Sequence, residues 1–141
     1  MYKACIPYGG YWCTPFAKWQ GSFANLHSVK FAAHVAAAEL DKRDVAPEVF
    51  DYGVLDISVP QKHSFYGTPW LMGLLGAPQA SGPTISQACA TSVRCLADAA
   101  QEIETGLATA ALTVTCDRTS NGPHVFYPNP AGPGGTGDSE D

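Results

Sequence analysis

The clearest periodic pattern in the chain lies between residues 91 and 107, just after a cysteine at position 89. Apolar side chains recur there at intervals of three and four residues, and most charged side chains fall between them. This spacing predicts an amphipathic helix that ends near Gly106. The members of the apolar stripe are Val93, Leu96, Ala97, Ala100, Ile103 and Leu107.

A second helix is predicted earlier in the chain. Its apolar stripe consists of Leu26, Val29, Ala33, Ala36 and Leu40. Ser22 or Asn25 is suited to cap this helix, which then runs to about Arg43. The alanines of the stripe allow a close approach to a sheet, so we expect a covering helix that carries His27 and His34 on its surface.

Short apolar runs predict strands at residues 2–7, 50–59, 83–88 and 108–116. The apolar stretch 70–75 adds a short helical piece. Strands and helices therefore alternate along the chain. This alternation predicts a layered α/β fold with a mostly parallel sheet, covering helices and right-handed crossovers.

The C-terminal stretch differs in composition from the rest. Residues 121–141 are rich in glycine and proline and are poorly suited to packing a core or sustaining regular structure. We expect a loop or tail there, and we assign the α/β domain to residues 1–120.

Composition and charge exclude several classes of protein. The chain has 141 residues, 45% of them hydrophobic, which suits about one domain with its own core. The net charge is −5 and the eight Lys and Arg residues are scattered, so we expect no nucleic-acid partner. No apolar run approaches the roughly 18 residues of a membrane helix, and the first residues lack the pattern of a signal peptide.

The cysteines indicate free thiols. There are five of them, an odd number, with no Cys-x-x-Cys pair and no Cys/His cluster at zinc-ligand spacing. We therefore expect no structural metal site. A reducing, cytoplasmic setting fits this pattern.

Cys89 is the candidate nucleophile because of where it lies. The predicted strand ends just before this residue and the predicted helix begins within a few residues of it. Unpaired N–H groups and the positive end of the helix dipole at such a position favour a thiolate, and the same N–H groups are suited to hold an oxyanion. A cysteine of this kind is a candidate acyl acceptor. The alternative is a buried cysteine that acts as a small hydrophobic residue.

The residues around Cys89 carry a family resemblance. The run Ile-Ser-Gln-Ala-Cys-Ala-Thr-Ser-Val at 85–93, followed by Leu96 and Ile103, resembles the acyl-enzyme cysteine segment of the thiolases. These enzymes are acyl-CoA acyltransferases that cleave or form 3-ketoacyl-CoA. Two residues depart from the family pattern: Ser92 stands where many thiolases have glycine, and Cys95 stands where a smaller residue is usual.

The resemblance also covers other parts of the chain. Residues 6–22, which include a Thr-Pro-Phe turn at 14–16, resemble the first strand of a thiolase and the turn that follows it. Residues 117–121, Asp-Arg-Thr-Ser-Asn, resemble the stretch after the next core strand. Most of residues 1–130 is therefore covered.

The resemblance implies a thiolase-like half-fold and an acyl-CoA acyltransferase that forms an acyl-enzyme on Cys89. It implies an acyl-CoA substrate and no bound cofactor. In the thiolases a histidine that activates the cysteine and a second, acid–base cysteine lie in a C-terminal half that this chain lacks. The implied partner is therefore a second thiolase half or subunit, within an oligomer. None of the four histidines is assigned the activating role, and His63, in the loop 61–67, stays a candidate for the approach to the active site.

Two other functions remain open at this point. One is a catalytically silent structural or regulatory subunit that keeps the thiolase fold for assembly. The other is a ketoacyl synthase-like condensing enzyme, since those enzymes share the overall fold and place a cysteine at a helix start.

Overall fold

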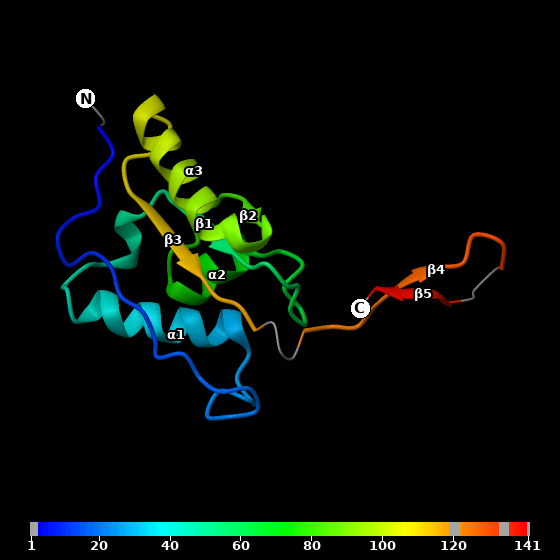
Figure 1. Cartoon of the computed structure of the whole chain (residues 1–141). Helices are drawn as coiled ribbons and strands as arrows, with labels where there is room; N and C mark the ends of the chain where they lie inside the picture. Colours follow the sequence, from blue (N-terminus) through cyan, green and yellow to red (C-terminus); the bar gives the residue numbers. More distant parts are fainter. Residues whose placement is uncertain (1–2, 119–121, 133–135, 141) are drawn as a thin grey trace.

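The computed structural model describes residues 3–118, 122–132 and 136–140. At its centre is a three-stranded sheet in the order β2-β1-β3. The middle strand β1 (Tyr52–Asp56) pairs in parallel with β2 (Thr84–Ile85) on one side and with β3 (Ala111–Thr115) on the other. The sheet lies between helices (Figure 1), which confirms the predicted α/β fold with a parallel sheet.

Helices cover both faces of the sheet. On one face α1 (Ser28–Asp41) and α2 (Thr68–Leu75) pack against Leu55, and on the other α3 (Thr91–Thr105) packs against Val54. Alternate side chains of a strand point to opposite faces, so β1 contributes to both cores. Two 3-10 helices, η1 at residues 47–49 and η2 at residues 88–90, connect the elements.

Thr68 connects three elements at the centre of the molecule. Its hydroxyl accepts a hydrogen bond from the Leu55 N–H (3.0 Å) and donates one to the Pro83 carbonyl (2.6 Å). Its own N–H donates to the Thr84 hydroxyl at 2.9 Å. The residue before it, Gly67, has φ +51° and lies so close to Thr84 that a Cβ would stand 1.7 Å from its Oγ1. The first turn of α2 is thereby fixed against β1 and β2.

Helix α1 differs from the sequence prediction in where it begins and in how buried His27 is. α1 begins at Ser28, and His27 occupies the capping position without a side-chain cap, so the caps expected at Ser22 or Asn25 are wrong. Contacts of His27 set this start: its Nε2 lies 2.5 Å from the Lys62 carbonyl, and its ring packs edge-on against Trp70. His27 is therefore half-buried and not a surface residue.

The predicted apolar stripe of α3 is largely exposed. Val93 is 68% exposed, Leu96 46% and Leu107 77%. The residues that α3 buries are Thr91, Cys95 and Ala99. The helix does end as expected, because Gly106 takes a left-handed conformation (φ +78°) and its N–H donates to the Ile103 carbonyl.

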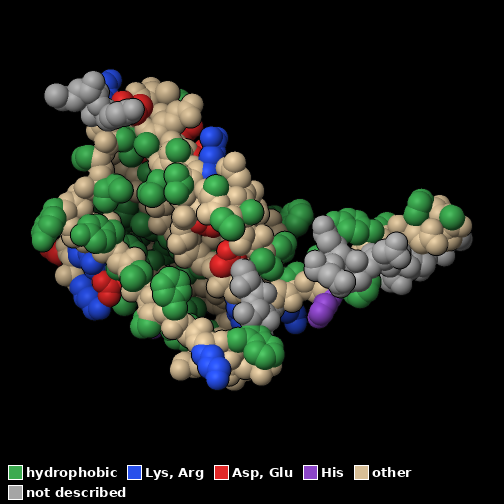
Figure 2. Space-filling view, in the orientation of Figure 1, with side chains coloured by type: hydrophobic (Ala, Val, Ile, Leu, Met, Phe, Trp, Pro, Cys, Tyr) green, Lys and Arg blue, Asp and Glu red, His purple; other side chains and the backbone are tan. Residues whose placement is uncertain are grey.

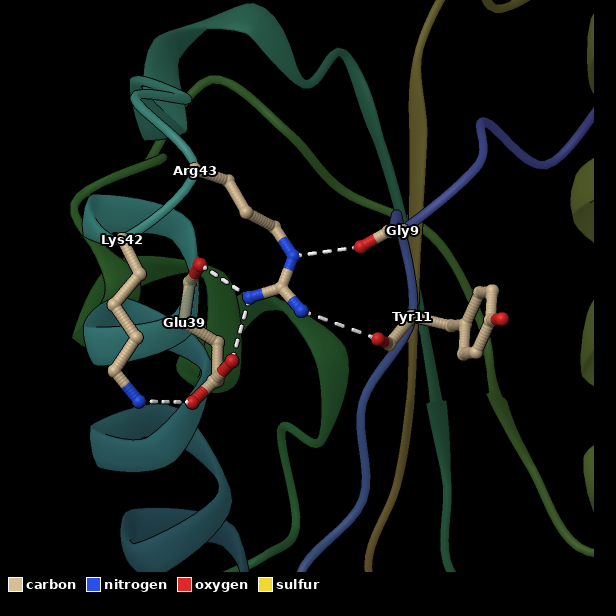
Figure 3. A network of polar contacts seen from close by, with 5 residues as sticks. All are labelled: Gly9, Tyr11, Glu39, Lys42 and Arg43. Atoms are coloured by element: carbon tan, nitrogen blue, oxygen red, sulfur yellow. Dashed lines mark hydrogen bonds and ion pairs between the residues drawn. The ribbon is translucent and has the colours of Figure 1, made fainter.

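The first predicted strand is wrong over its described part. Residues 3–7 form no strand, and an irregular N-terminal segment, residues 3–26, crosses the molecule instead. Arg43 holds this segment near its middle by donating to the carbonyls of Gly9 (2.7 Å) and Tyr11 (3.2 Å), while Glu39 accepts from the same guanidinium (Figure 3). The Arg43 guanidinium also lies 5.2 Å from the centre of the Trp12 ring.

Both ends of the N-terminal segment are also bonded to the body. The N–H groups of Lys3 and Ala4 donate to the Glu104 carboxylate. Arg118, just after β3, donates to the carbonyls of Ala24 and Leu26. The segment is therefore held by side chains rather than by pairing with a strand.

The C-terminal stretch also differs from the expected loop or tail. Val125–Pro128 forms β4 and Thr136–Glu140 forms β5, which pair antiparallel in a separate two-stranded sheet. This pair extends away from the three-stranded sheet (Figure 1). The division of the chain into a domain at residues 1–120 and a C-terminal stretch stays a prediction.

Candidate functional site

A cleft of about 1660 Å³ runs along the outer side of β3. Its walls come from the N-terminal segment, from α1, from β3 and from α3. Figure 2 shows hydrophobic side chains gathered around this hollow. The carboxyl ends of the parallel strands meet at one end of the cleft, where open α/β sheets bind their ligands. The polar residues Asp56, Ser58, Cys89 and Asp117 line the cleft there.

Cys89 lies in the short turn that connects β2 to α3. It is exposed and belongs to η2 (Ala88–Ala90), directly before the first residue of α3. Thr91 fixes this turn, because its hydroxyl accepts from the Gln87 N–H (2.8 Å) and donates to the Ala88 carbonyl (2.6 Å). The position of Cys89 between a strand and a helix start is therefore the one that the sequence predicted.

The backbone before Cys89 is strained. Ala88 has φ +47°, a conformation that residues with a Cβ rarely adopt. Strain of this kind costs on the order of 1–3 kcal/mol and is concentrated at functional sites, where the surrounding structure holds it in place. Here the two hydrogen bonds of Thr91 supply that restraint.

The other cysteines have different environments. Burial raises the pKa of Cys95 to about 11, and burial also raises the pKa of Cys116 to about 12. Both thiols therefore stay protonated at neutral pH. Cys5 and Cys13 are exposed on the N-terminal segment and lie far from any helix start in the sequence.

Two carboxyl groups at the strand ends have contrasting surroundings. Asp117 accepts hydrogen bonds from the Ser58 hydroxyl and from the N–H groups of Ser58 and Val59. Asp56, the last residue of β1, is only 4% exposed. Burial and then the negative charge of Asp117 raise the pKa of Asp56 to about 6.

The described residues that line the cleft include no histidine. His63 is exposed in the loop between β1 and α2 with φ +61°, outside the residues that line the cleft. Within the described residues there is no group of three His, Cys, Asp or Glu side chains placed to hold a metal ion. No helix in that part of the chain is long and apolar enough to cross a membrane.

Two residues of the site were not identified from the sequence. Asp56 falls within the strand predicted at residues 50–59, and its burial depends on β1 being the central strand. Thr91 was read only as part of the cysteine segment. Its position two residues after the cysteine, at a helix start, is the signal that was available, because threonine hydroxyls commonly bond the backbone there.

Comparison with known proteins identifies relatives of this chain. The family model of the thiolase N-terminal domain matches residues 11–134. The comparison with curated proteins gave no match.

Solved structures share the fold. Acetyl-CoA acetyltransferase from Bacillus anthracis superposes with a TM-score of 0.71 at 18% identity, over 79% of this chain and 29% of that one. The acetyl-CoA acetyltransferase of Syntrophomonas wolfei gives 0.68 at 26% identity, over 79% and 28%. Human mitochondrial 3-ketoacyl-CoA thiolase in complex with CoA gives 0.62 at 21% identity, over 70% and 25%. The chain thus spans less than a third of the length of each of these structures.

Proposed function

The chain belongs to the thiolase family, because residues 11–134 match the model of its N-terminal domain. On this premise we propose that Cys89 accepts an acyl group from a coenzyme A thioester. The observation that carries the proposal is the exposed thiol of Cys89 in a restrained, strained turn at the start of α3 and at the end of a cleft. The sulfur attacks the thioester carbonyl, coenzyme A leaves, and an acceptor then takes the acyl group from the enzyme.

The start of α3 supports the oxyanion that forms in this step. The first N–H groups of a helix have no partner within the helix, and the helix dipole adds partial positive charge at the same end. Cys89 lies in η2, two residues before α3 begins. The N–H groups of Ala90 and Thr91 already donate to the carbonyls of Gln87 and Ala88, so the helix dipole is the support that we propose for the oxyanion.

The substrate class follows from the relatives. Two structural neighbours are acetyl-CoA acetyltransferases and one is a 3-ketoacyl-CoA thiolase crystallised with CoA. We therefore propose a coenzyme A thioester as substrate and no bound cofactor.

A second thiolase half or subunit is proposed to complete the site. The apolar stripe of α3 is exposed, and exposed apolar patches of this kind indicate an interface. Among the described residues no strand pairs with the outer edge of β3. The even-numbered residues of β3 bond β1, so the N–H groups of Ala111, Thr113 and Thr115 point to the other side. The stripe and the edge both border the cleft, and the solved relatives are more than three times longer than the matched part.

Acylation of the complete assembly tests the proposal. After incubation with acetyl-CoA, peptide mass spectrometry is expected to find the acetyl group on Cys89. Cys89→Ser removes this label and turnover, whereas Cys5→Ser, which changes another exposed thiol beside the cleft, keeps both. Acylation at a different cysteine, or turnover that survives Cys89→Ser, would contradict the proposal.

One observation favours the alternative of a catalytically silent subunit. Among the described residues no histidine lines the cleft, where the family resemblance implies an activating histidine. A complete assembly in which Cys89 is never acylated, while the partner half carries an acyl group, would support this alternative.

A further inference from the structure

One buried hydroxyl group bonds the turn that carries Cys89. The two neighbours of Cys89 are Ala88 and Ala90, whose methyl groups form no hydrogen bonds. Thr91, the first residue of α3, is only 3% exposed. Its hydroxyl accepts from the Gln87 N–H at 2.8 Å and donates to the Ala88 carbonyl at 2.6 Å. The hydroxyl therefore connects the entry of the turn to the strained residue within it.

Ala88 is the residue that this connection restrains. Its φ of +47° is unfavourable for a residue with a Cβ, and such a conformation persists only where the surrounding structure holds it. The Ala88 carbonyl accepts from both the N–H and the hydroxyl of Thr91. Relaxation of Ala88 to negative φ would turn this carbonyl away from Thr91 and would move Cys89, which follows directly. Ala88, Cys89 and Thr91 all line the cleft.

The elements on either side of the turn are fixed by other contacts. Before it, the Ile57 N–H donates to the Ile85 carbonyl at 3.3 Å and so joins β2 to β1. After it, Cys95 and Ala99 of α3 pack against Val54. Loss of the Thr91 hydroxyl is therefore expected to change the short segment around Cys89 and to leave the arrangement of β1, β2 and α3 in place.

We propose that Thr91 is a positioning residue for acyl transfer, an inference that rests on the proposed acyl-acceptor role of Cys89. Its hydroxyl holds Ala88 at positive φ and thereby keeps the Cys89 sulfur in the position from which it attacks the thioester carbonyl. Attack requires a narrow range of distances and directions, so a turn that samples other conformations acylates more slowly. Backbone strain of this kind corresponds to a shift of roughly 5- to 150-fold between two conformations.

Single-turnover acylation of the complete assembly by acetyl-CoA tests the proposal, with the Cys89 peptide quantified by mass spectrometry. Thr91→Val keeps the shape of the side chain and removes both hydrogen bonds of the hydroxyl. We expect it to lower the maximal rate of acylation by about tenfold or more, while the acetyl-CoA concentration that gives half of that rate changes by less than about twofold. This split is expected because the substrate still binds and only the attacking atom is misplaced.

Two matched variants accompany Thr91→Val. Thr91→Ser retains the hydroxyl and is expected to acylate within about threefold of the wild-type rate. Thr105→Val removes a hydroxyl that donates to the Gln101 carbonyl at the other end of the same helix, and it is expected to keep the wild-type rate.

A second substitution tests whether Thr91 acts through Ala88. Glycine adopts positive φ about as readily as negative φ, so Ala88→Gly removes the strain without replacing the lost hydrogen bonds. Added to Thr91→Val, it is expected to raise the rate of acylation by about threefold or more. No recovery in the double variant would show that the loss does not pass through Ala88 and would overturn the proposal.

The backbone conformation of Ala88 is measured in the 141-residue chain without any acyl substrate. NMR chemical shifts of its Cα and Cβ distinguish a left-handed residue from an extended or helical one. We expect the left-handed conformation in the wild type and in Thr91→Ser, and its loss in Thr91→Val. A left-handed Ala88 in Thr91→Val overturns the proposal, and so does a Thr91→Ser variant that acylates as slowly as Thr91→Val.

Ala88→Val keeps the proposal testable if Thr91→Val does not fold. A β-branched residue is still less favourable than alanine at positive φ, so acylation several-fold slower than in the wild type is expected. An unchanged rate in Ala88→Val would overturn the proposal.

The acylation experiment distinguishes failure of this proposal from failure of the one on which it rests. If Cys89 of the wild-type assembly is never acylated, the acyl-acceptor role falls and the positioning role falls with it. If wild-type Cys89 is acylated and Thr91→Val reacts at the same rate, acyl transfer stands and only the role of Thr91 is removed.

Discussion

Replacing Thr68 by valine tests whether one hydroxyl group holds β1, β2 and α2 together. Valine has nearly the same shape as threonine but lacks the oxygen, and Thr68 is fully buried. The change removes the hydrogen bond to the Pro83 carbonyl and the one from the Leu55 N–H. The Leu55 N–H keeps a longer contact to Pro83 at 3.3 Å. A buried group left without its partner costs about 1–3 kcal/mol, so we expect a loss of roughly 2–3 kcal/mol in the free energy of unfolding.

Urea unfolding followed by circular dichroism measures this loss. It is a substantial part of the roughly 5–15 kcal/mol free energy of unfolding of a typical domain. Thr105→Val is the matched control, because the Thr105 hydroxyl donates to the carbonyls of Gln101 and Glu102 from an exposed position. We expect that control to change stability by less than about 0.5 kcal/mol. Equal losses in the two variants, or a loss below about 0.5 kcal/mol for Thr68→Val, would refute the role assigned to the buried hydroxyl.

Three further predictions concern other parts of the molecule. Arg43→Met is expected to release the N-terminal segment, residues 3–26, so that limited proteolysis cuts the segment several-fold faster. Lys42→Met, which changes a more exposed neighbour, is expected to leave the rate of cleavage unchanged. The pKa of Asp56 is raised by folding from 3.8 to about 6, so the folded state binds the extra proton and stability falls as the pH rises from about 4 to about 6. This fall amounts to at most about 3 kcal/mol, and Asp56→Asn should abolish it. Urea unfolding at pH 4 and pH 7 measures it, and the same pH dependence of stability in the wild type and in Asp56→Asn would contradict the prediction. Leu96→Glu places a charge on the exposed stripe of α3. It should leave the free energy of unfolding unchanged and lower the self-association of the chain, as measured by sedimentation. A wild-type chain that sediments as a well-behaved monomer would disprove the expectation that the exposed stripe drives association.

The sheet, the covering helices and the position of Cys89 could be predicted from the sequence because they depend on short-range patterns. β1 follows from an apolar run, and α3 from its spacing and from Gly106. Cys89 falls between two such elements, so its place at a helix start needed no knowledge of distant contacts.

The N-terminal segment was mispredicted because its structure depends on distant residues. Residues 2–7 have the composition of a strand, but a strand requires a neighbour to pair with. The N–H groups of Lys3 and Ala4 bond to the Glu104 side chain instead. Arg43 reaches this segment from more than 30 residues away, and no local pattern indicates that contact. Residue 2, the first of the predicted strand, and residues 119–121, in the last stretch that resembles the thiolases, lie outside the described residues.

The burial of Asp56 and the exposure of the α3 stripe have a common cause in the order of the strands. β1 is central and β3 is at the edge, so a polar residue at the end of β1 is covered from both sides, while α3 extends past β3 over the cleft. Sequence periodicity identifies which residues share a helix face but not which neighbour covers that face. An apolar stripe therefore predicts a partner surface without saying that the partner belongs to the same domain.

The cleft connects the proposed chemistry to assembly. Cys89 and Asp56 lie at one end of it, and the open edge of β3 and the apolar stripe of α3 form its sides. A partner that covers the stripe also covers the approach to Cys89 and excludes water from it. Because desolvation strengthens the interaction of an oxyanion with the positive end of the α3 dipole, the partner is expected to raise acyl transfer even before it contributes any side chain. If both proposals hold, docking and catalysis use one surface. A variant that weakens docking on the stripe, such as Leu96→Glu, should then lower acylation of Cys89 in the same proportion as it lowers the fraction of assembled protein.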